Sequence, residues 1–173
     1  GYYLLNGRKI WTSTAQITNK IMIIARTSDR NNKKPTEGLS LFYTDFNKDN
    51  IEARVINKMG RAAVDTNELF IDNLKVPIED IIGEEGKGFS YLIHSLNPER
   101  ILVAAEAYGI AKNALERAVK YANERIVFDR KIGKNQSIQH PLADAWAKLE
   151  SLKLLILKAA NLYDNDLPCG VES

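Results

Sequence analysis

The sequence predicts a mixed α+β protein: an antiparallel β-sheet or open barrel, followed by long antiparallel helices of an incomplete helical bundle. Two observations carry this prediction. Up to residue 82, short runs of β-branched and aromatic residues are separated by Asn, Gly and Pro turn signals. From residue 83 onward, apolar residues recur at helical spacing over two long stretches. We therefore expect a β-domain over residues 1–82 and a helical domain over residues 83–173.

The strands of the first half follow from local turn chemistry and apolar runs. Tyr2–Leu5 precedes Asn6-Gly7, a dipeptide typical of type I′ hairpins, so we expect residues 8–14 to form the returning strand. The continuous apolar run at residues 21–27 suits a strand that is buried on both faces. Further strands are expected at residues 39–43, 51–55 and 67–71, with residues 74–77 as the exit from the sheet.

Two long helices are expected in the second half. Asn97 is a favourable N-cap and Pro98 a favourable first helical residue, so we expect one helix from Asn97 to about Arg125, after a short helix at residues 89–96. One face of it would carry Ile101, Ala105, Tyr108, Leu115, Ala118 and Ala122. The second helix has a seam of period 3.5, typical of antiparallel helix packing, formed by Ile138, Leu142, Ala145, Leu149, Leu152, Ile156, Ala159 and Tyr163.

The second helix carries further apolar residues outside this seam: Trp146, Leu154, Leu155 and Leu157. Two helices form a hairpin and not a closed bundle, so we expect more helices from sequence beyond this chain or from other subunits. The chain begins without Met, and we expect it to be a fragment of a longer protein.

The bulk composition argues against several classes of function. The formal net charge is +2, and no basic block interleaved with aromatic residues points to a nucleic-acid partner. No apolar run reaches the roughly 18 residues that a membrane span requires. The single cysteine, Cys169, fits a reducing compartment, and no His, Cys, Asp and Glu cluster has the spacing of a metal site. We expect neither a nucleic-acid nor a membrane partner, and no metal.

Glu99 is a candidate catalytic carboxylate in the helical half. It would lie in the first turn of the expected helix, where a negative charge complements the helix dipole. From the residues alone, this structural role is favoured over a catalytic one.

Four stretches, in order along the chain, resemble the acyl-CoA dehydrogenase family. They are residues 1–11; Lys58-Met59-Gly60 with residues 65–69 and 76–77; residues 83–89 followed by Glu99-Arg100; and residues 125–128 with Ile132-Gly133 and Gln136. The resemblance implies that residues 1–82 are most of the middle β-domain of that family. Residues 83–173 would be the first part of its C-terminal helical domain.

The resemblance also implies an activity. Family members are FAD enzymes, commonly homotetramers, that introduce a trans double bond between Cα and Cβ of an acyl-CoA thioester. They pass the electrons to electron-transferring flavoprotein. The expected substrates are fatty or branched-chain acyl-CoA thioesters. A weak carbon acid such as the α-carbon needs a positioned base, and the β-hydrogen must leave as hydride to a cofactor, namely to flavin N5.

Glu99 and Arg100 match a Glu-Arg pair of the family. In the isovaleryl-CoA and long-chain branches, the catalytic glutamate occupies this position, whereas in other branches it comes from a later helix. The resemblance therefore favours Glu99 as the base that removes the α-proton, with a base in a later helix as the alternative. Arg100 is expected near the acyl-CoA substrate.

Five residues match positions that contact FAD in the family: Trp11, Ser13, Arg125, Phe128 and Gln136. Trp11 and Ser13 match a Trp-x-Thr/Ser pattern beside the flavin ring, and two residues apart on a strand they would share one face. The other three match residues that hold the pyrophosphate and adenosine of a neighbouring subunit's FAD, by means of a guanidinium, an aromatic ring and an amide. The family usually continues Arg-x-x-Phe-Gly, whereas Asp129 stands here, so we expect its carboxylate to point away or this contact to differ.

Alternatives to a dehydrogenase stay open at this stage. An acyl-CoA oxidase of the same architecture would give its electrons to oxygen. A non-catalytic helical interaction module is suggested by the seam of the second helix. A cytoplasmic location is expected, with the mitochondrial matrix as the alternative. The isolated chain is expected to be inactive and to aggregate through exposed apolar helix faces.

Overall fold

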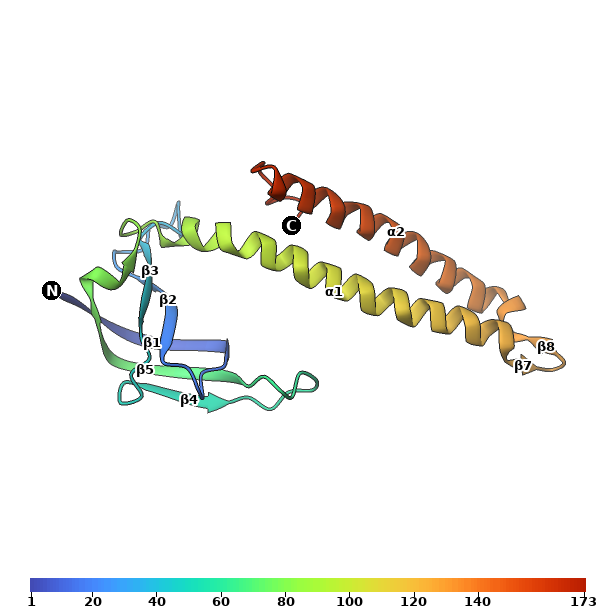
Figure 1. Cartoon of the computed structure of the whole chain (residues 1–173), viewed down its shortest axis with the longest axis horizontal. Helices are drawn as coiled ribbons and strands as arrows, with labels where there is room; N and C mark the ends of the chain where they lie inside the picture. Colours follow the sequence, from blue (N-terminus) through green and yellow to red (C-terminus); the bar gives the residue numbers. More distant parts are fainter. The chain divides into compact units, whose positions relative to one another are not determined.

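The computed structural model describes residues 1–173 and confirms the α+β fold class. The chain divides into two compact units, Gly1–Ile93 and His94–Ser173. The first unit contains the two main β-sheets, and the second contains most of a long helix together with its antiparallel neighbour (Figure 1).

Two three-stranded antiparallel sheets build the first unit. One sheet has the order β1-β5-β4, from β1 (Tyr2–Ser13), β5 (Thr66–Pro77) and β4 (Ile51–Val55). The other has the order β2-β3-β6, from β2 (Lys20–Arg26), β3 (Leu39–Asp45) and β6 (Ile81–Ile82), and the short 3₁₀ helix η1 (Ile78–Asp80) precedes β6. Both sheets contribute to one hydrophobic core, whose buried members include Leu5, Ile23, Phe42, Leu69, Leu74 and Val76.

The predicted hairpin at Asn6-Gly7 is wrong, because β1 runs through this dipeptide as one strand. Its partner is the distant strand β5, and the pairing shifts register between Leu5 and Gly7. The Asn6 side-chain oxygen accepts a 2.8 Å hydrogen bond from the backbone N–H of Asn73, which has a left-handed φ of 51°. The dipeptide therefore marks an irregularity in a long strand, and the pairing with β5 overrides the local turn signal.

Two further strand predictions need correction. The predicted strand and exit at residues 67–71 and 74–77 are one continuous strand, β5. The apolar strand β2 is buried on one face only, because Ile21 and Ile23 face the core while Met22 is 53% exposed. The outer face of β2 is only partly covered in this chain, so the rule for strands buried on both faces does not apply.

Helix α1 (Gly88–Glu124) is a single helix of 37 residues, so the predicted break at residues 96–97 is wrong. The helix begins at Gly88, where a Cβ would lie 2.3 Å from the Leu41 backbone nitrogen. Residues before it are bound to β3: the N–H of Gly86 donates to Ser40 Oγ at 2.8 Å. Pro98 lies inside the helix. Pro98 would suit the first position of a helix, but it does not occupy that position here. The contact of Gly88 with β3 decides where the helix begins.

The predicted seam of α2 (Gln136–Asp164) is confirmed. Seven of its eight residues are buried or half-buried, and Tyr163 is at the margin, with an exposed fraction of 36%. On α1, Leu115 and Ala122 are buried and Tyr108 is half-buried, but the predicted face members Ala105 and Ala118 are exposed. Neither helix contains an apolar stretch that could cross a membrane.

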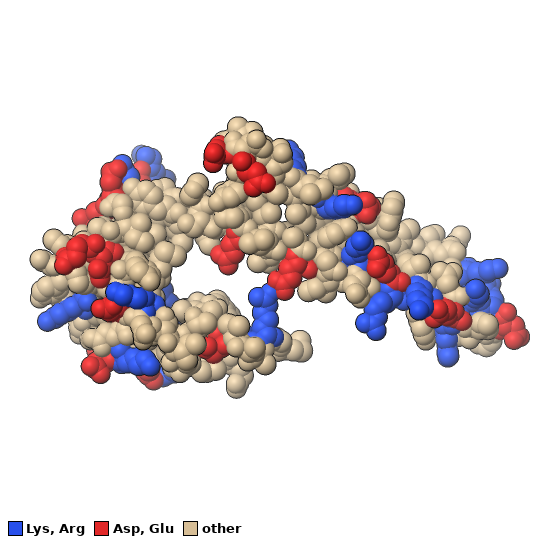
Figure 2. All heavy atoms as spheres, in the orientation of Figure 1, with Lys and Arg blue, Asp and Glu red and all other residues tan.

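A short β-hairpin connects the two helices. It consists of β7 (Ile126–Val127) and β8 (Arg130–Lys131), followed by the 3₁₀ helix η2 (Ile132–Lys134). Gly133 lies against α1, since a Cβ there would be 2.8 Å from the carbonyl oxygen of Ala122. Figure 2 shows positive and negative side chains mixed along the helical unit.

Candidate active site

Trp11 lies at a bend in β1, and its side chain is presented to solvent. The register with β5 shifts between Lys9 and Thr12, which gives β1 one extra residue, and Trp11 has a φ of 67°. Its side chain is 66% exposed, and Ser13 is also exposed. Trp11 and Ser13 were expected to share one face of a regular strand, but the bulge interrupts the alternation of side chains along β1. Their shared exposure therefore arises from the bend. We call residues 10–13 the Trp11 bend.

A buried polar network supports the bend from behind. Asn67, on β5, has no exposed surface, and its side-chain amide donates to the carbonyl oxygen of Thr12 at 3.0 Å. Gln16 donates to the Asn67 side-chain oxygen at 2.7 Å, and Asn67 also donates to the Asp65 carboxylate. This hydrogen bond from Asn67 lowers the pKa of Asp65 below its usual value. The network holds the C-terminal side of the bend to β5.

Lys9 holds the other side of the bend. Its ammonium donates a 2.7 Å hydrogen bond to the carbonyl oxygen of Ile24 on β2. The side chain is half-buried and lines a pocket of about 220 Å³ whose other lining residues are almost all apolar, among them Ile10, Met22 and Leu92. Burial lowers the pKa of Lys9 below its usual value.

Glu99 and Arg100 are both exposed on α1. The helix begins at Gly88, so the prediction that Glu99 lies in the first turn is wrong, and its carboxylate gains nothing from the helix dipole, which acts within one turn of the end. The two side chains form no ion pair, in line with the approximately 100° between successive helical residues. Arg100 is therefore free to bind a group other than Glu99.

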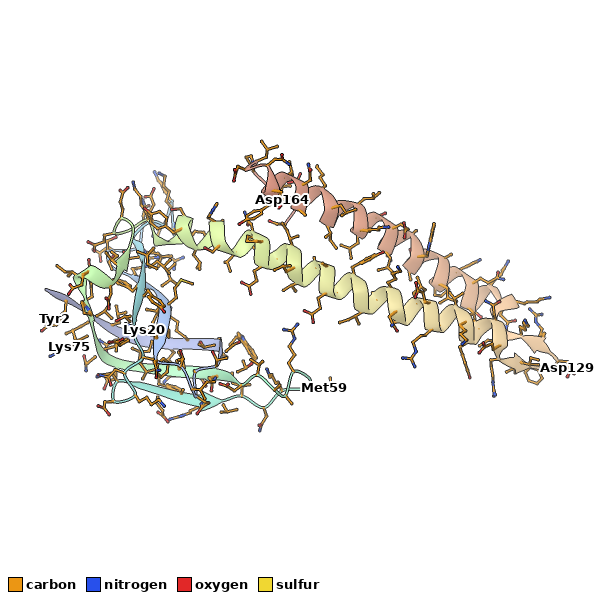
Figure 3. The ribbon with its side chains drawn as sticks, viewed as in Figure 1. Tyr2, Lys20, Met59, Lys75, Asp129 and Asp164 are labelled. Carbon is orange, nitrogen blue, oxygen red and sulfur yellow. The ribbon has the colours of Figure 1, made fainter.

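Phe128 and Asp129 are the two central residues of the turn between β7 and β8. Their φ angles are 50° and 57°, the left-handed combination of a type I′ turn, and Val127 pairs with Arg130 across it. Phe128 is 95% exposed at the end of the hairpin, and Figure 3 places Asp129 there as well. A glycine would adopt the Asp129 conformation without strain, which explains physically why the family usually has Gly after this Phe.

Arg125 and Gln136 lie at the two ends of the segment that contains this hairpin. Arg125 follows α1 directly, and its carbonyl oxygen accepts a 2.9 Å hydrogen bond from the N–H of Ile132. Gln136 is the first residue of α2. The side chains of Arg125, Phe128 and Gln136 are all exposed, so the hairpin brings a guanidinium, an aromatic ring and an amide into one segment that is open to a ligand.

Comparisons with known proteins identify the family from both halves of the chain. The model of the acyl-CoA dehydrogenase middle domain matches residues 1–74, and the model of the acyl-CoA dehydrogenase C-terminal domain matches residues 86–173. The chain belongs to the acyl-CoA dehydrogenase family. Members of this family are FAD-dependent oxidoreductases.

Several relatives show what this chain is similar to. It is 40% identical over 170 residues to 3-(aryl)acrylate reductase of Clostridium sporogenes, which covers 98% of this chain and 43% of the relative. It is 38% identical over 165 residues to the caffeyl-CoA reductase-Etf complex subunit CarC of Acetobacterium woodii. This match covers 95% of this chain and 43% of the relative. The structure of butyryl-CoA dehydrogenase from Megasphaera elsdenii superposes with a TM-score of 0.82 at 34% identity, over 99% of this chain and 44% of the other. The chain thus spans less than half the length of these relatives.

The residues that support the Trp11 bend were missed by sequence analysis. Lys9, Asn67, Asp65 and Gln16 fix the Trp11 bend, but none was a candidate. Asp65 and Asn67 lay within a stretch that carried the family resemblance. Nothing local in that stretch shows that Asn67 contacts Thr12, which is 55 residues away in the sequence.

Proposed function

We propose that the full-length protein is an FAD-dependent enzyme that interconverts saturated and α,β-unsaturated acyl-CoA thioesters. The observation that carries the proposal is the match to both family domains, combined with an exposed tryptophan on a buttressed bend at the position that contacts flavin in the family. Electron-transferring flavoprotein is the proposed electron partner, and a homotetramer the proposed assembly.

The residues present fit FAD. An exposed indole with the hydroxyl of Ser13 nearby in the sequence suits a flat aromatic ring with polar edges. The exposed Arg125 guanidinium suits a pyrophosphate, and Phe128 offers an aromatic face. FAD, when bound, supplies the hydride acceptor that no side chain can provide. Asp129 shares the turn with Phe128, and we propose that its carboxylate points away from the pyrophosphate.

The protein's own residues then have separate roles. We assign Glu99 as the base that takes the α-proton, because its carboxylate is exposed and is not neutralised by Arg100. A bound acyl chain would remove water from around the Glu99 carboxylate, and a less solvated carboxylate is a stronger base. Arg100 binds the thioester substrate. Trp11 and Ser13 orient the ring system, and Arg125, Phe128 and Gln136 hold the pyrophosphate and adenosine of a neighbouring subunit's FAD.

The test uses the full-length protein purified with FAD. Saturated acyl-CoA thioesters of different lengths are added without oxygen, and the flavin absorbance is followed for wild type, Glu99→Gln and, as a matched control on the same helix, Glu116→Gln. We expect bleaching in wild type and in the control, and a loss of at least about a hundredfold in bleaching rate in Glu99→Gln with FAD still bound. Bleaching that survives in Glu99→Gln would assign the base to a later helix. An absence of bleaching with every thioester would overturn the proposed substrate class.

The reverse direction is a second candidate, because two relatives are named as reductases. An α,β-unsaturated thioester should then reoxidise the chemically reduced flavin faster than the saturated thioester bleaches the oxidised form. Rapid reoxidation by oxygen would instead indicate an acyl-CoA oxidase. The named relatives are bacterial, which supports the cytoplasm as the proposed location.

A further inference from the structure

Two side chains tie the Trp11 bend to the β-core, one on each side of Trp11. Thr12 follows Trp11, and its carbonyl oxygen accepts a hydrogen bond from the Asn67 side chain. Lys9 lies two residues before Trp11, and its ammonium donates to the carbonyl oxygen of Ile24. The Asn67 contact joins strands that are already paired, since β1 lies beside β5. The Lys9 contact is different, because β1 and β2 belong to separate sheets. Lys9 therefore supplies a connection that the backbone ladder does not.

The environment of Lys9 is unfavourable for a cation. The pocket around it is lined by aliphatic side chains and Met22, with Thr12 as the one hydroxyl group. Burial is the only influence that shifts its pKa, so no carboxylate compensates the charge. A lysine on a sheet surface usually extends its ammonium into water, whereas this one turns to a backbone carbonyl. A methionine would fill the same space without the desolvation cost, so the ammonium must contribute something that the apolar stem does not.

The bend itself requires two fixed ends. A bulge with a left-handed tryptophan is a strained conformation, and the surrounding structure must hold it. If only the Thr12 side is anchored, the residues between Lys9 and Thr12 can relax toward regular pairing with β5. Such relaxation would turn the Trp11 side chain to a different direction, because a one-residue slip reverses the side-chain alternation.

We propose that Lys9 is a positioning residue for FAD: by binding the Ile24 carbonyl across the gap between the two sheets, it holds the Trp11 bend in the conformation that receives the flavin ring. This inference rests on the proposed function for its ligand, but its conformational part concerns the β-unit alone. Lys9 acts through Trp11 and does not itself take part in proton or hydride transfer.

The test compares three variants of the full-length protein. Lys9→Met keeps the apolar stem and removes the donor, and Lys9→Arg keeps a charged donor. Lys75→Met is the matched control, because it removes an exposed lysine from the paired strand β5. The dissociation constant for FAD is measured by titration, and hydrogen–deuterium exchange is measured over residues 10–13 in protein freed of cofactor.

We expect Lys9→Met to melt no lower than wild type, yet to bind FAD about tenfold more weakly, since a charge-assisted hydrogen bond is lost. Amide exchange over the Trp11 bend should accelerate in the same variant. Lys9→Arg should recover most of both properties, and Lys75→Met should match wild type in both.

An unchanged FAD dissociation constant and unchanged exchange in Lys9→Met would overturn the inference and leave Lys9 as a space-filling residue. If wild type itself fails to bind FAD, the proposed function is wrong. The exchange data on the cofactor-free protein still decide whether Lys9 holds the bend.

Discussion

Left-handed backbone conformations occur at two of the proposed FAD contacts, Trp11 and Phe128, and at Asp129, which shares the turn with Phe128. Trp11, Phe128 and Asp129 have φ angles of 67°, 50° and 57°. For a residue other than glycine, this region costs on the order of 1–2 kcal/mol, so it persists only where the surrounding structure imposes it. Trp11 and Phe128 are also highly exposed, and their burial therefore does not offset this cost. The strain is consistent with a ligand-binding role, in which the backbone presents each ring in a fixed direction.

Asp129 allows this argument to be tested by a single substitution. In Asp129→Gly the left-handed turn is relieved of its steric cost, and we expect the free energy of unfolding to rise by up to about 1 kcal/mol. The measurement is chemical denaturation of the full-length protein, followed by circular dichroism. If Asp129 also weakens the contact with the pyrophosphate, the same variant should bind FAD more tightly.

Asp29→Gly is the matched control for this turn substitution. Asp29 lies in an exposed loop and has no left-handed φ, so glycine there should be neutral or destabilising. Equal effects of the two substitutions would show that the turn carries no strain.

At the scale of single elements, the beginning of α1 is set by contact with strand β3. Gly88 lies so close to the backbone of Ser40 and Leu41 that no side chain fits there, and the N–H of Gly86 donates to Ser40 Oγ. The stretch from Gly83 to Gly88 thus has a structural role as the start of the helix. Its glycines permit close packing.

Two glycines of α1 should respond to alanine with opposite signs. In Gly88→Ala the new Cβ would lie 2.3 Å from the Leu41 nitrogen, and backbone cannot move aside cheaply, so we expect a loss of about 3 kcal/mol or a failure to fold. At Gly109, nothing lies within 4 Å, and Gly109→Ala should stabilise the helix by about 1 kcal/mol. Denaturation midpoints of the two variants give the comparison. A tolerated Gly88→Ala would show that α1 is not docked at this residue.

The sequence predicted those elements whose signal is periodic and local. The seam of α2 was correct because a 3.5-residue repeat over eight positions leaves little choice of buried face. The start of α1 was wrong because Asn97-Pro98 is a good local helix start, whereas the true start depends on contact with β3. The Asn6-Gly7 turn failed for the same reason, since pairing with β5 is non-local. The candidate site residues came from family resemblance, and their supports, Lys9 and Asn67, depend on contacts that no local pattern encodes.

At the scale of the whole molecule, the chain spans about 43% of the length of its relatives and leaves much apolar helix surface uncovered. On α2, Trp146, Leu154 and Leu157 are exposed by 61%, 68% and 56%. A groove of about 350 Å³ runs between α1 and α2, where Trp146 lies with Tyr108 and Leu115 beside charged residues of both helices. Surface of this kind on a monomer promotes association, so we expect the 173-residue chain alone to self-associate as its concentration rises.

Substitutions on the uncovered face of α2 should change the free energy of unfolding by an amount that depends on chain length, whereas substitutions in the seam should not. Leu149 belongs to the seam, and Leu149→Ala should lower the free energy of unfolding by roughly 1–2 kcal/mol both in this chain and in the full-length protein. Leu154 is exposed here, so Leu154→Ala should cost less than about 0.5 kcal/mol in the chain alone. In the full-length protein the same change should cost about 2 kcal/mol or more, because additional helices or subunits bury the side chain. Denaturation of both variants in both lengths tests this expectation. An equally small cost of Leu154→Ala in both lengths would mean that this face stays open to solvent. The apolar residues of α2 outside the seam would then need a different explanation.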